Sequence, residues 1–102
     1  MDATIKKKWV KALRSGRYKQ TDSQLYDARI DAHCCLGVLC RVVRAERDGE
    51  AFIWDGEIDA LELPLPLLAH VGMDGAQMGE VAKMNDDGKT FKEIANYIER
   101  QL

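Results

Sequence analysis

The stretch His33-Cys34-Cys35-Leu36-Gly37-Val38-Leu39-Cys40 holds all three cysteines of the chain within its longest apolar run. At 100° per residue, the spacing predicts a helix over residues 33–46. One face of this helix would carry the core residues Cys35, Leu36, Leu39, Val42 and Val43. Cys40 falls on the flank of that face, and Cys34 lies about 140° away in the first turn. We therefore expect a central helix around which the other elements pack.

Gly37 stands inside this predicted helix. A glycine in a helix interior costs about 1 kcal/mol relative to alanine. We therefore expect another backbone segment, or a ligand, to approach the helix closely at this position.

The length and composition favour one globular domain. The chain has 102 residues, of which 46% are hydrophobic and 31% charged. No apolar run approaches the roughly 18 residues that a membrane span needs, and the N-terminal residues lack the apolar block of a secretory signal. Helical geometry also keeps Cys34 and Cys40 beyond disulfide distance. Thiols without a disulfide partner are typical of a protein in a reducing compartment. We expect a cytoplasmic protein without a membrane contact.

Local patterns predict the other elements. Apolar residues at helical spacing indicate a helix over residues 4–15, ending at Gly16. The pair Asp55-Gly56 predicts a hairpin over residues 51–60, and residues 25–30 are either a short strand or a loop. Short helices are expected over residues 67–71 and from Asp74 or Gly75 to Met84, and the capping box Thr90-Phe91-Lys92-Glu93 begins a C-terminal helix.

These elements predict an α+β fold, a mainly helical single domain with one small antiparallel β-hairpin or sheet. The apolar stripes of its three longest predicted helices should meet in one core. The residues expected there are Trp9, Leu13, Cys35, Leu39, Val42, Phe91, Ile94 and Ile98.

Charge is segregated along the chain. Residues 1–20 hold seven basic side chains and one acid, which leaves eight basic and sixteen acidic side chains in the remaining 82 residues. The candidate binding residues of this basic segment are Lys7, Lys11, Arg14, Arg17, Tyr18 and Lys19. They suit a phosphate, a nucleotide or an acidic protein partner, and the alternative is a solvated helix face. An isoelectric point near 5.6 disfavours general nucleic-acid binding.

Cys34 is the candidate nucleophile, because amides and dipole at a helix N-terminus lower a thiol pKa. His33 or His70 could act as its base, with Asn85 or Asp86 as an orienting group. This arrangement predicts that Cys34 is the most exposed and fastest-alkylated cysteine. The alternative is that the cysteines are small packing residues.

The sequence offers no metal or cofactor site. The cysteines lack a Cys-x-x-Cys spacing and diverge on the predicted helix. The acids Asp55, Glu57 and Asp59 read more simply as the solvated face of the hairpin. We expect neither a metal nor a cofactor.

Three blocks occur in order along the chain: residues 8–20, residues 34–40 and residues 84–95. Their sequences are KWVKALRSGRYKQ, CCLGVLC and MNDDGKTFKEIA. Together they resemble a family of small uncharacterised proteins encoded by tailed phages and prophages. The chain departs from that pattern at Ala32-His33, where the family tends to have glycine and an aromatic residue, and at Arg41, where it tends to have an acid. The resemblance implies a setting in the cytoplasm of an infected bacterium and no particular reaction.

Our sequence-based hypothesis is a non-enzymatic phage accessory protein that binds a host protein or an anionic small molecule. Antagonism of a bacterial defence system is an extension that rests on the phage setting alone. One alternative is a small cysteine-dependent hydrolase or transferase that uses Cys34. Another is a structural or assembly factor, a homo-oligomer whose basic and acidic parts meet.

Overall fold

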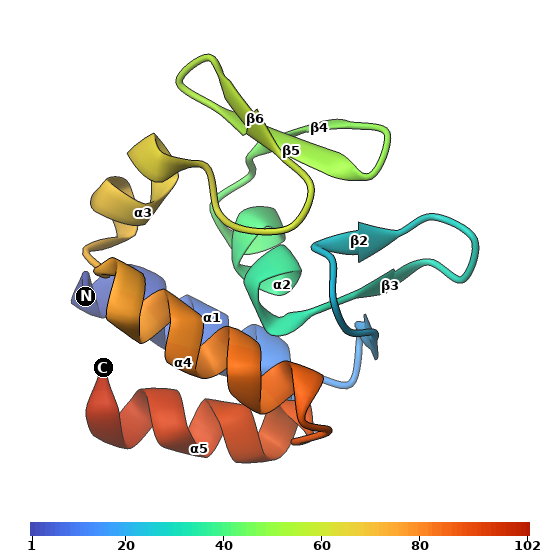
Figure 1. The fold of residues 1–102 in the computed structure, drawn as a ribbon. Helices are drawn as coiled ribbons and strands as arrows, with labels where there is room; N and C mark the ends of the chain where they lie inside the picture. The colour runs from blue at the N-terminus through green and yellow to red at the C-terminus, as the bar shows by residue number, and fades with distance from the viewer.

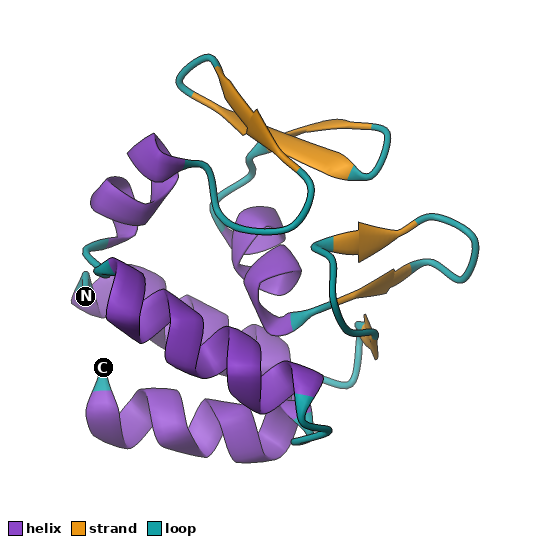
Figure 2. Ribbon diagram, in the orientation of Figure 1, coloured by secondary structure: helices purple, strands orange, loops and turns teal.

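The computed structural model describes residues 1–102 and contains five helices and two small sheets (Figures 1 and 2). This architecture confirms the predicted mainly helical α+β fold. The helices are α1 (Ala3–Arg14), α2 (Cys35–Val42), α3 (Leu65–Val71), α4 (Gly75–Asp86) and α5 (Phe91–Gln101). None of them is both long enough and apolar enough to cross a bilayer.

The strands form two three-stranded sheets where the sequence predicted one. The first contains β1 (Lys19–Gln20), β2 (Tyr26–Asp27) and β3 (Ala32–His33), with β3 in the middle. Its β1 strand is parallel to β3, and β2 is antiparallel to β3. The second sheet contains β4 (Glu46–Asp48), β5 (Ala51–Trp54) and β6 (Glu57–Asp59), all antiparallel, with β5 in the middle.

The β5–β6 hairpin forms as predicted. Its turn residues Asp55 and Gly56 have φ angles of 50° and 81°. Two positive φ angles in a two-residue turn match the type I′ geometry, whose twist fits antiparallel strands.

The central helix is shorter than predicted at both ends. His33 lies in β3, paired with Gln20 on one side and Tyr26 on the other, and Cys34 is the N-cap residue with extended backbone angles. At the other end Arg44 has a φ of 60°, a left-handed conformation that ends the helix. The residues from Glu46 onward then form β4 instead of a last helical turn.

The close approach expected at Gly37 is confirmed, and the approaching group is backbone. A Cβ atom at this position would lie 1.9 Å from the carbonyl oxygen of Leu25. The same carbonyl accepts a hydrogen bond from the Cys34 N–H at 3.3 Å. Glycine therefore allows the segment before β2 to pack directly on the first turn of α2.

The α2 helix lies between the layer of α1, α4 and α5 and the two sheets (Figure 1). Seven of the eight residues expected in the core are buried; Val42, at the end of the shortened helix, is only half-buried. The Trp9 side chain is fully buried, and its indole N–H donates to the carbonyl oxygen of Cys35 at 2.9 Å. This bond joins α1 to α2 inside the core.

For the helices other than α2, the predicted ends are close to the observed ones. Thr90 and Glu93 form the expected capping box of α5, and Asp74 forms another with Gln77 at α4. Gly72, with a φ of 77°, ends α3. These caps satisfy free backbone N–H groups at the starts of the two C-terminal helices, whose apolar faces form one side of the core.

Candidate functional site

A hollow lined by basic residues lies where the second half of α1 meets the end of α2. It consists of two adjoining cavities of about 330 and 800 Å³, both lined by Lys8, Lys11, Arg17 and Val42. Arg44 lines the larger one. We call the hollow formed by these residues and their neighbours the basic cleft. Its half-buried apolar floor consists of Ile5, Ala12, Val42 and Val43.

Local structure explains why the cations gather there. Lys8 and Lys11 are one turn apart on α1, whose opposite face buries Trp9 and Leu13. Arg17 follows Gly16, whose positive φ of 76° turns the chain away from the helix end. Arg44 projects from the left-handed turn that ends α2. Two helix ends therefore bring separate basic residues to one hollow.

The positive charge of the basic cleft is uncompensated. No acidic residue lines either cavity, and none of the four cations takes part in the three ion pairs of the structure. Like charges one helical turn apart, such as Lys8 and Lys11, repel by a few tenths of a kcal/mol. A low-dielectric cleft lined by one sign of charge concentrates the field and attracts anions.

The structure places three of the six predicted binding residues in the basic cleft: Lys11, Arg17 and Tyr18. Arg14 does not belong to it, because its guanidinium donates to Glu99 at 3.0 Å and to Asn96 at 2.8 Å on α5. This pairing lowers the pKa of the Glu99 carboxyl. Arg14 therefore ties α1 to α5 and lines neither cavity of the basic cleft.

The other two predicted binding residues, Lys7 and Lys19, are exposed but line neither cavity. Two cations of the basic cleft, Lys8 and Arg44, are not among the six predicted binding residues. The Lys8/Lys11 spacing could have indicated the first of these. Arg44 could not be placed, because the central helix was predicted to continue through it.

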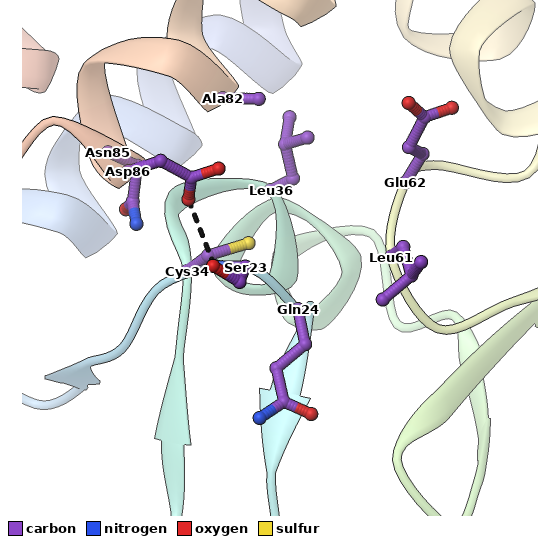
Figure 3. A pocket seen from close by; sticks show the side chains of 9 residues that line it. All are labelled: Ser23, Gln24, Cys34, Leu36, Leu61, Glu62, Ala82, Asn85 and Asp86. Atoms are coloured by element: carbon purple, nitrogen blue, oxygen red, sulfur yellow. Dashed lines mark hydrogen bonds between the residues drawn. The ribbon is translucent and has the colours of Figure 1, made fainter.

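The predicted nucleophile, Cys34, faces a different pocket of about 200 Å³ (Figure 3). Asn85, Asp86 and Glu62 also line it, and the Ser23 N–H donates to the Asp86 carboxylate at 2.9 Å. Cys34 itself is only 6% exposed; it is the most exposed of the three cysteines, as predicted, but it is still buried. Burial raises the pKa of its thiol to about 11 despite the nearby amides of the helix start. The thiol is therefore protonated at neutral pH.

Neither histidine makes a hydrogen bond to the Cys34 sulfur. The His33 ring lies 4.7 Å from the Tyr26 ring and 5.3 Å from the Tyr18 ring, measured between centroids. Its Nε2 accepts a hydrogen bond from Arg41 Nε at 3.0 Å. Burial, with a smaller contribution from Arg41, lowers the pKa of His33 to about 4. His70 lies on α3, where it stacks on Trp54 at 4.9 Å and borders the basic cleft.

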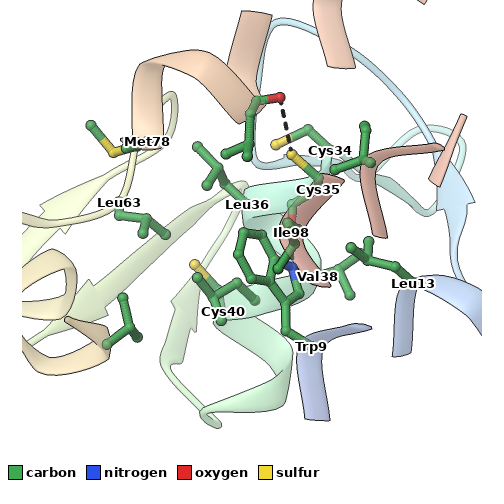
Figure 4. Close-up of a cluster of buried hydrophobic side chains, with 14 of the residues drawn as sticks. Trp9, Leu13, Cys34, Cys35, Leu36, Val38, Cys40, Leu63, Met78 and Ile98 are labelled. Atoms are coloured by element: carbon green, nitrogen blue, oxygen red, sulfur yellow. Dashed lines mark hydrogen bonds between the residues drawn. The ribbon is translucent and has the colours of Figure 1, made fainter. Parts of the chain in front are cut away.

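The other two cysteines belong to the core (Figure 4). Cys35 and Cys40 are fully buried, free of disulfides, and have thiol pKa values raised by burial. No group of three or more histidine, cysteine or acidic side chains is placed to hold a metal ion. All three cysteines lie within the hydrophobic core cluster.

Asn85, which the sequence suggested as an orienting group for catalysis, links three parts of the fold. Its side-chain oxygen accepts from the Cys35 N–H at 3.0 Å and from Gln20 Nε2 at 3.1 Å. Its amide nitrogen donates to the Thr21 carbonyl at 2.7 Å. Because the Cys34 side chain does not cap α2, Asn85 supplies that missing cap from α4.

The comparisons with known proteins give one match. A family model described as Domain of unknown function (DUF8296) matches residues 1–63. These residues include α1, α2 and every basic side chain of the cleft. No curated protein and no solved structure matches the chain.

Proposed function

The chain belongs to this family, DUF8296, and we propose that it is a non-enzymatic protein that binds an anionic ligand in the basic cleft. One observation carries the proposal. Four cations, Lys8, Lys11, Arg17 and Arg44, surround an apolar floor without a single acidic neighbour in the lining.

The rest of the chain makes this arrangement notable. Acids outnumber basic residues by 17 to 15, so pairing partners are abundant. Arg14, on the same helix as Lys8 and Lys11, does find such a partner in Glu99. The cations of the basic cleft therefore have no acidic partner in the chain. A bound anion would pair with them through charge-assisted hydrogen bonds.

The enzyme alternative finds less support. A thiol nucleophile needs its thiolate and an adjacent base, whereas Cys34 is buried, has a raised pKa and lacks a hydrogen bond to an imidazole. The pocket in front of it is lined by the acids Asp86 and Glu62, which disfavour an anionic thiolate further.

We further propose a phage accessory role in the cytoplasm of an infected bacterium. This setting rests on the resemblance of three sequence blocks, residues 8–20, 34–40 and 84–95, to phage and prophage proteins. The first block supplies Lys8, Lys11 and Arg17 of the basic cleft, and the second covers most of α2, whose end carries Val42. The anionic ligand would then be a host molecule that the protein binds during infection.

Calorimetry with tripolyphosphate tests the binding proposal, because this probe carries dense negative charge and no apolar group. The wild-type protein should bind it, and the affinity should fall as salt is raised from 50 to 200 mM. The double variant Lys8→Glu/Lys11→Glu should lose at least tenfold in affinity. These side chains are exposed, so the fold should survive.

The matched control is Lys7→Glu/Lys19→Glu, which makes the same change of charge outside the cleft. At 200 mM salt, where long-range charge effects are largely screened, this variant should bind tripolyphosphate within about twofold of the wild-type affinity. Equal losses in the two double variants, or no binding by the wild type at millimolar probe, would refute the proposal.

A further inference from the structure

Resting on the proposed function, we infer that the ligand of the basic cleft is a nucleoside polyphosphate. Its phosphates would lie among the cations, and its base would lie against Tyr18 and the apolar floor. The lining of the cleft is uneven. Charged residues predominate in the part shared by both cavities, and the aromatic ring of Tyr18 lies at one end.

The charge of the cleft matches a short polyphosphate. Four cations converge on it from two helix ends, and a nucleoside triphosphate carries about the same number of negative charges near neutral pH, since terminal phosphates have a second pKa near 6. A monocarboxylate or a single phosphate would leave most of the cations unpaired. The ligand should therefore carry its charge densely on one short segment.

The Tyr18 end of the cleft is suited to a flat ring. Tyr18, Ala12 and Val42 are half-buried there, with Ser15 as a neighbouring polar group. The Tyr18 ring is held in place by its edge-to-face contact with the buried ring of His33, at 84° between the planes. Aromatic side chains that are fixed in this way bind bases by stacking without reading their identity.

The size of this end also fits a small molecule. Its cavity of about 330 Å³ lies at the lower limit of the range for small-ligand sites. A stable protein partner would instead need on the order of 800 Å² of contact surface on this chain. The features of the cleft are confined to one hollow, which favours the small ligand.

The experiment compares ATP, GTP, CTP and UTP with tripolyphosphate by calorimetry, all without divalent metal. At least one nucleotide should bind about tenfold tighter than tripolyphosphate, because stacking adds to the phosphate contacts. Tyr18→Leu should abolish that difference, so that every nucleotide binds the variant no more tightly than tripolyphosphate does. Tyr18→Phe should keep it, since the ring remains.

Tyr97→Leu is the matched control, because Tyr97 is also half-buried but lies on α5 outside the cleft. It should leave all affinities within about twofold of the wild type. Equal affinity for tripolyphosphate and for every nucleotide would overturn the nucleoside inference and leave the anion-binding proposal standing. Failure of all five probes to bind would overturn both.

Discussion

Gly37 and the carbonyl oxygen of Leu25 are so close that a Cβ atom at residue 37 would lie 1.9 Å from that oxygen. The contact joins the start of α2 to the segment before β2. It is a backbone contact, so no flexible side chain can move away to make room.

Gly37→Ala should therefore destabilise the protein although alanine is the better helix former. Overpacking typically costs 1–3 kcal/mol, against a gain of about 1 kcal/mol in helix propensity. Because the clash is with backbone, we expect a net loss of about 2 kcal/mol in urea unfolding. Gly79→Ala in α4 is the control, since nothing lies within 4 Å of its added Cβ. It should raise the free energy of unfolding, and a similar gain at Gly37 would contradict the contact.

The Trp9 indole should contribute through its hydrogen bond as well as through burial. Trp9→Phe removes the donor to the Cys35 carbonyl and leaves a space in the core. We expect a loss of about 2–3 kcal/mol from these two effects. Trp54→Phe is the comparison, because Trp54 is only half-buried and makes no side-chain hydrogen bond. Equal losses in the two variants would show that the buried bond adds nothing.

Asn85→Leu should destabilise the protein strongly, although leucine and asparagine are similar in size. The change removes three hydrogen bonds and leaves the Cys35 N–H buried without an acceptor. An unsatisfied buried donor costs about 1–3 kcal/mol, so the expected total is about 3 kcal/mol or more in denaturant unfolding. Gln101→Leu at the exposed end of α5, where the side chain makes no hydrogen bond, should change stability by less than about 0.5 kcal/mol. A small loss at Asn85 would mean that water replaces its contacts.

All three thiols should resist alkylation in the folded protein. With its pKa raised to about 11, the Cys34 thiol is roughly one part in ten thousand thiolate at pH 7, and its side chain is buried. Mass spectrometry after iodoacetamide treatment should show labelling of the three cysteines only as the protein unfolds. Rapid labelling of Cys34 alone, without denaturant, would restore the enzyme hypothesis.

The comparison of sequence with structure separates local from distant interactions. The Asp55-Gly56 turn, the Thr90/Glu93 capping box and the need for glycine at position 37 were predictable, because each depends on a short run of residues. The identity of the group that approaches Gly37 was not, since Leu25 lies outside that helix. The local sequence therefore indicates that another group approaches position 37 closely, and only the tertiary structure identifies that group.

The misplaced ends of α2 show the same limit. His33 continues the helical pattern in the sequence. In the structure it pairs with a two-residue strand on each side and therefore belongs to β3. Strands of this length carry no recognisable alternation in the sequence. The candidate site differs more from the prediction, because Arg44 lines the basic cleft and Arg14 does not. The partner of Arg14, Glu99, is 85 residues away and could not be identified from helical spacing.

His33 should make stability depend on pH between about 4 and 6.5. Its pKa in the folded protein is lowered to about 4 from the usual 6.5, so the unfolded state takes up a proton first as the pH falls. Stability is therefore greatest above pH 6.5 and decreases toward pH 4, by up to about 1.4 kcal/mol per pH unit. Protonation would also end the acceptance of the Arg41 hydrogen bond by His33 Nε2.

Urea unfolding at pH 7, 6 and 5 would measure this effect before most carboxylates titrate. The carboxyls of Asp27, Glu93 and Glu99 have lowered pKa values, so the stability that they contribute is lost only at more acidic pH. His33→Phe keeps a ring between the two tyrosines but cannot titrate, and should flatten the pH dependence in this window. His70→Gln, a change at the exposed histidine, should leave it intact. A dependence that disappears in His70→Gln and persists in His33→Phe would assign the proton to the surface residue and contradict the buried, neutral state of His33.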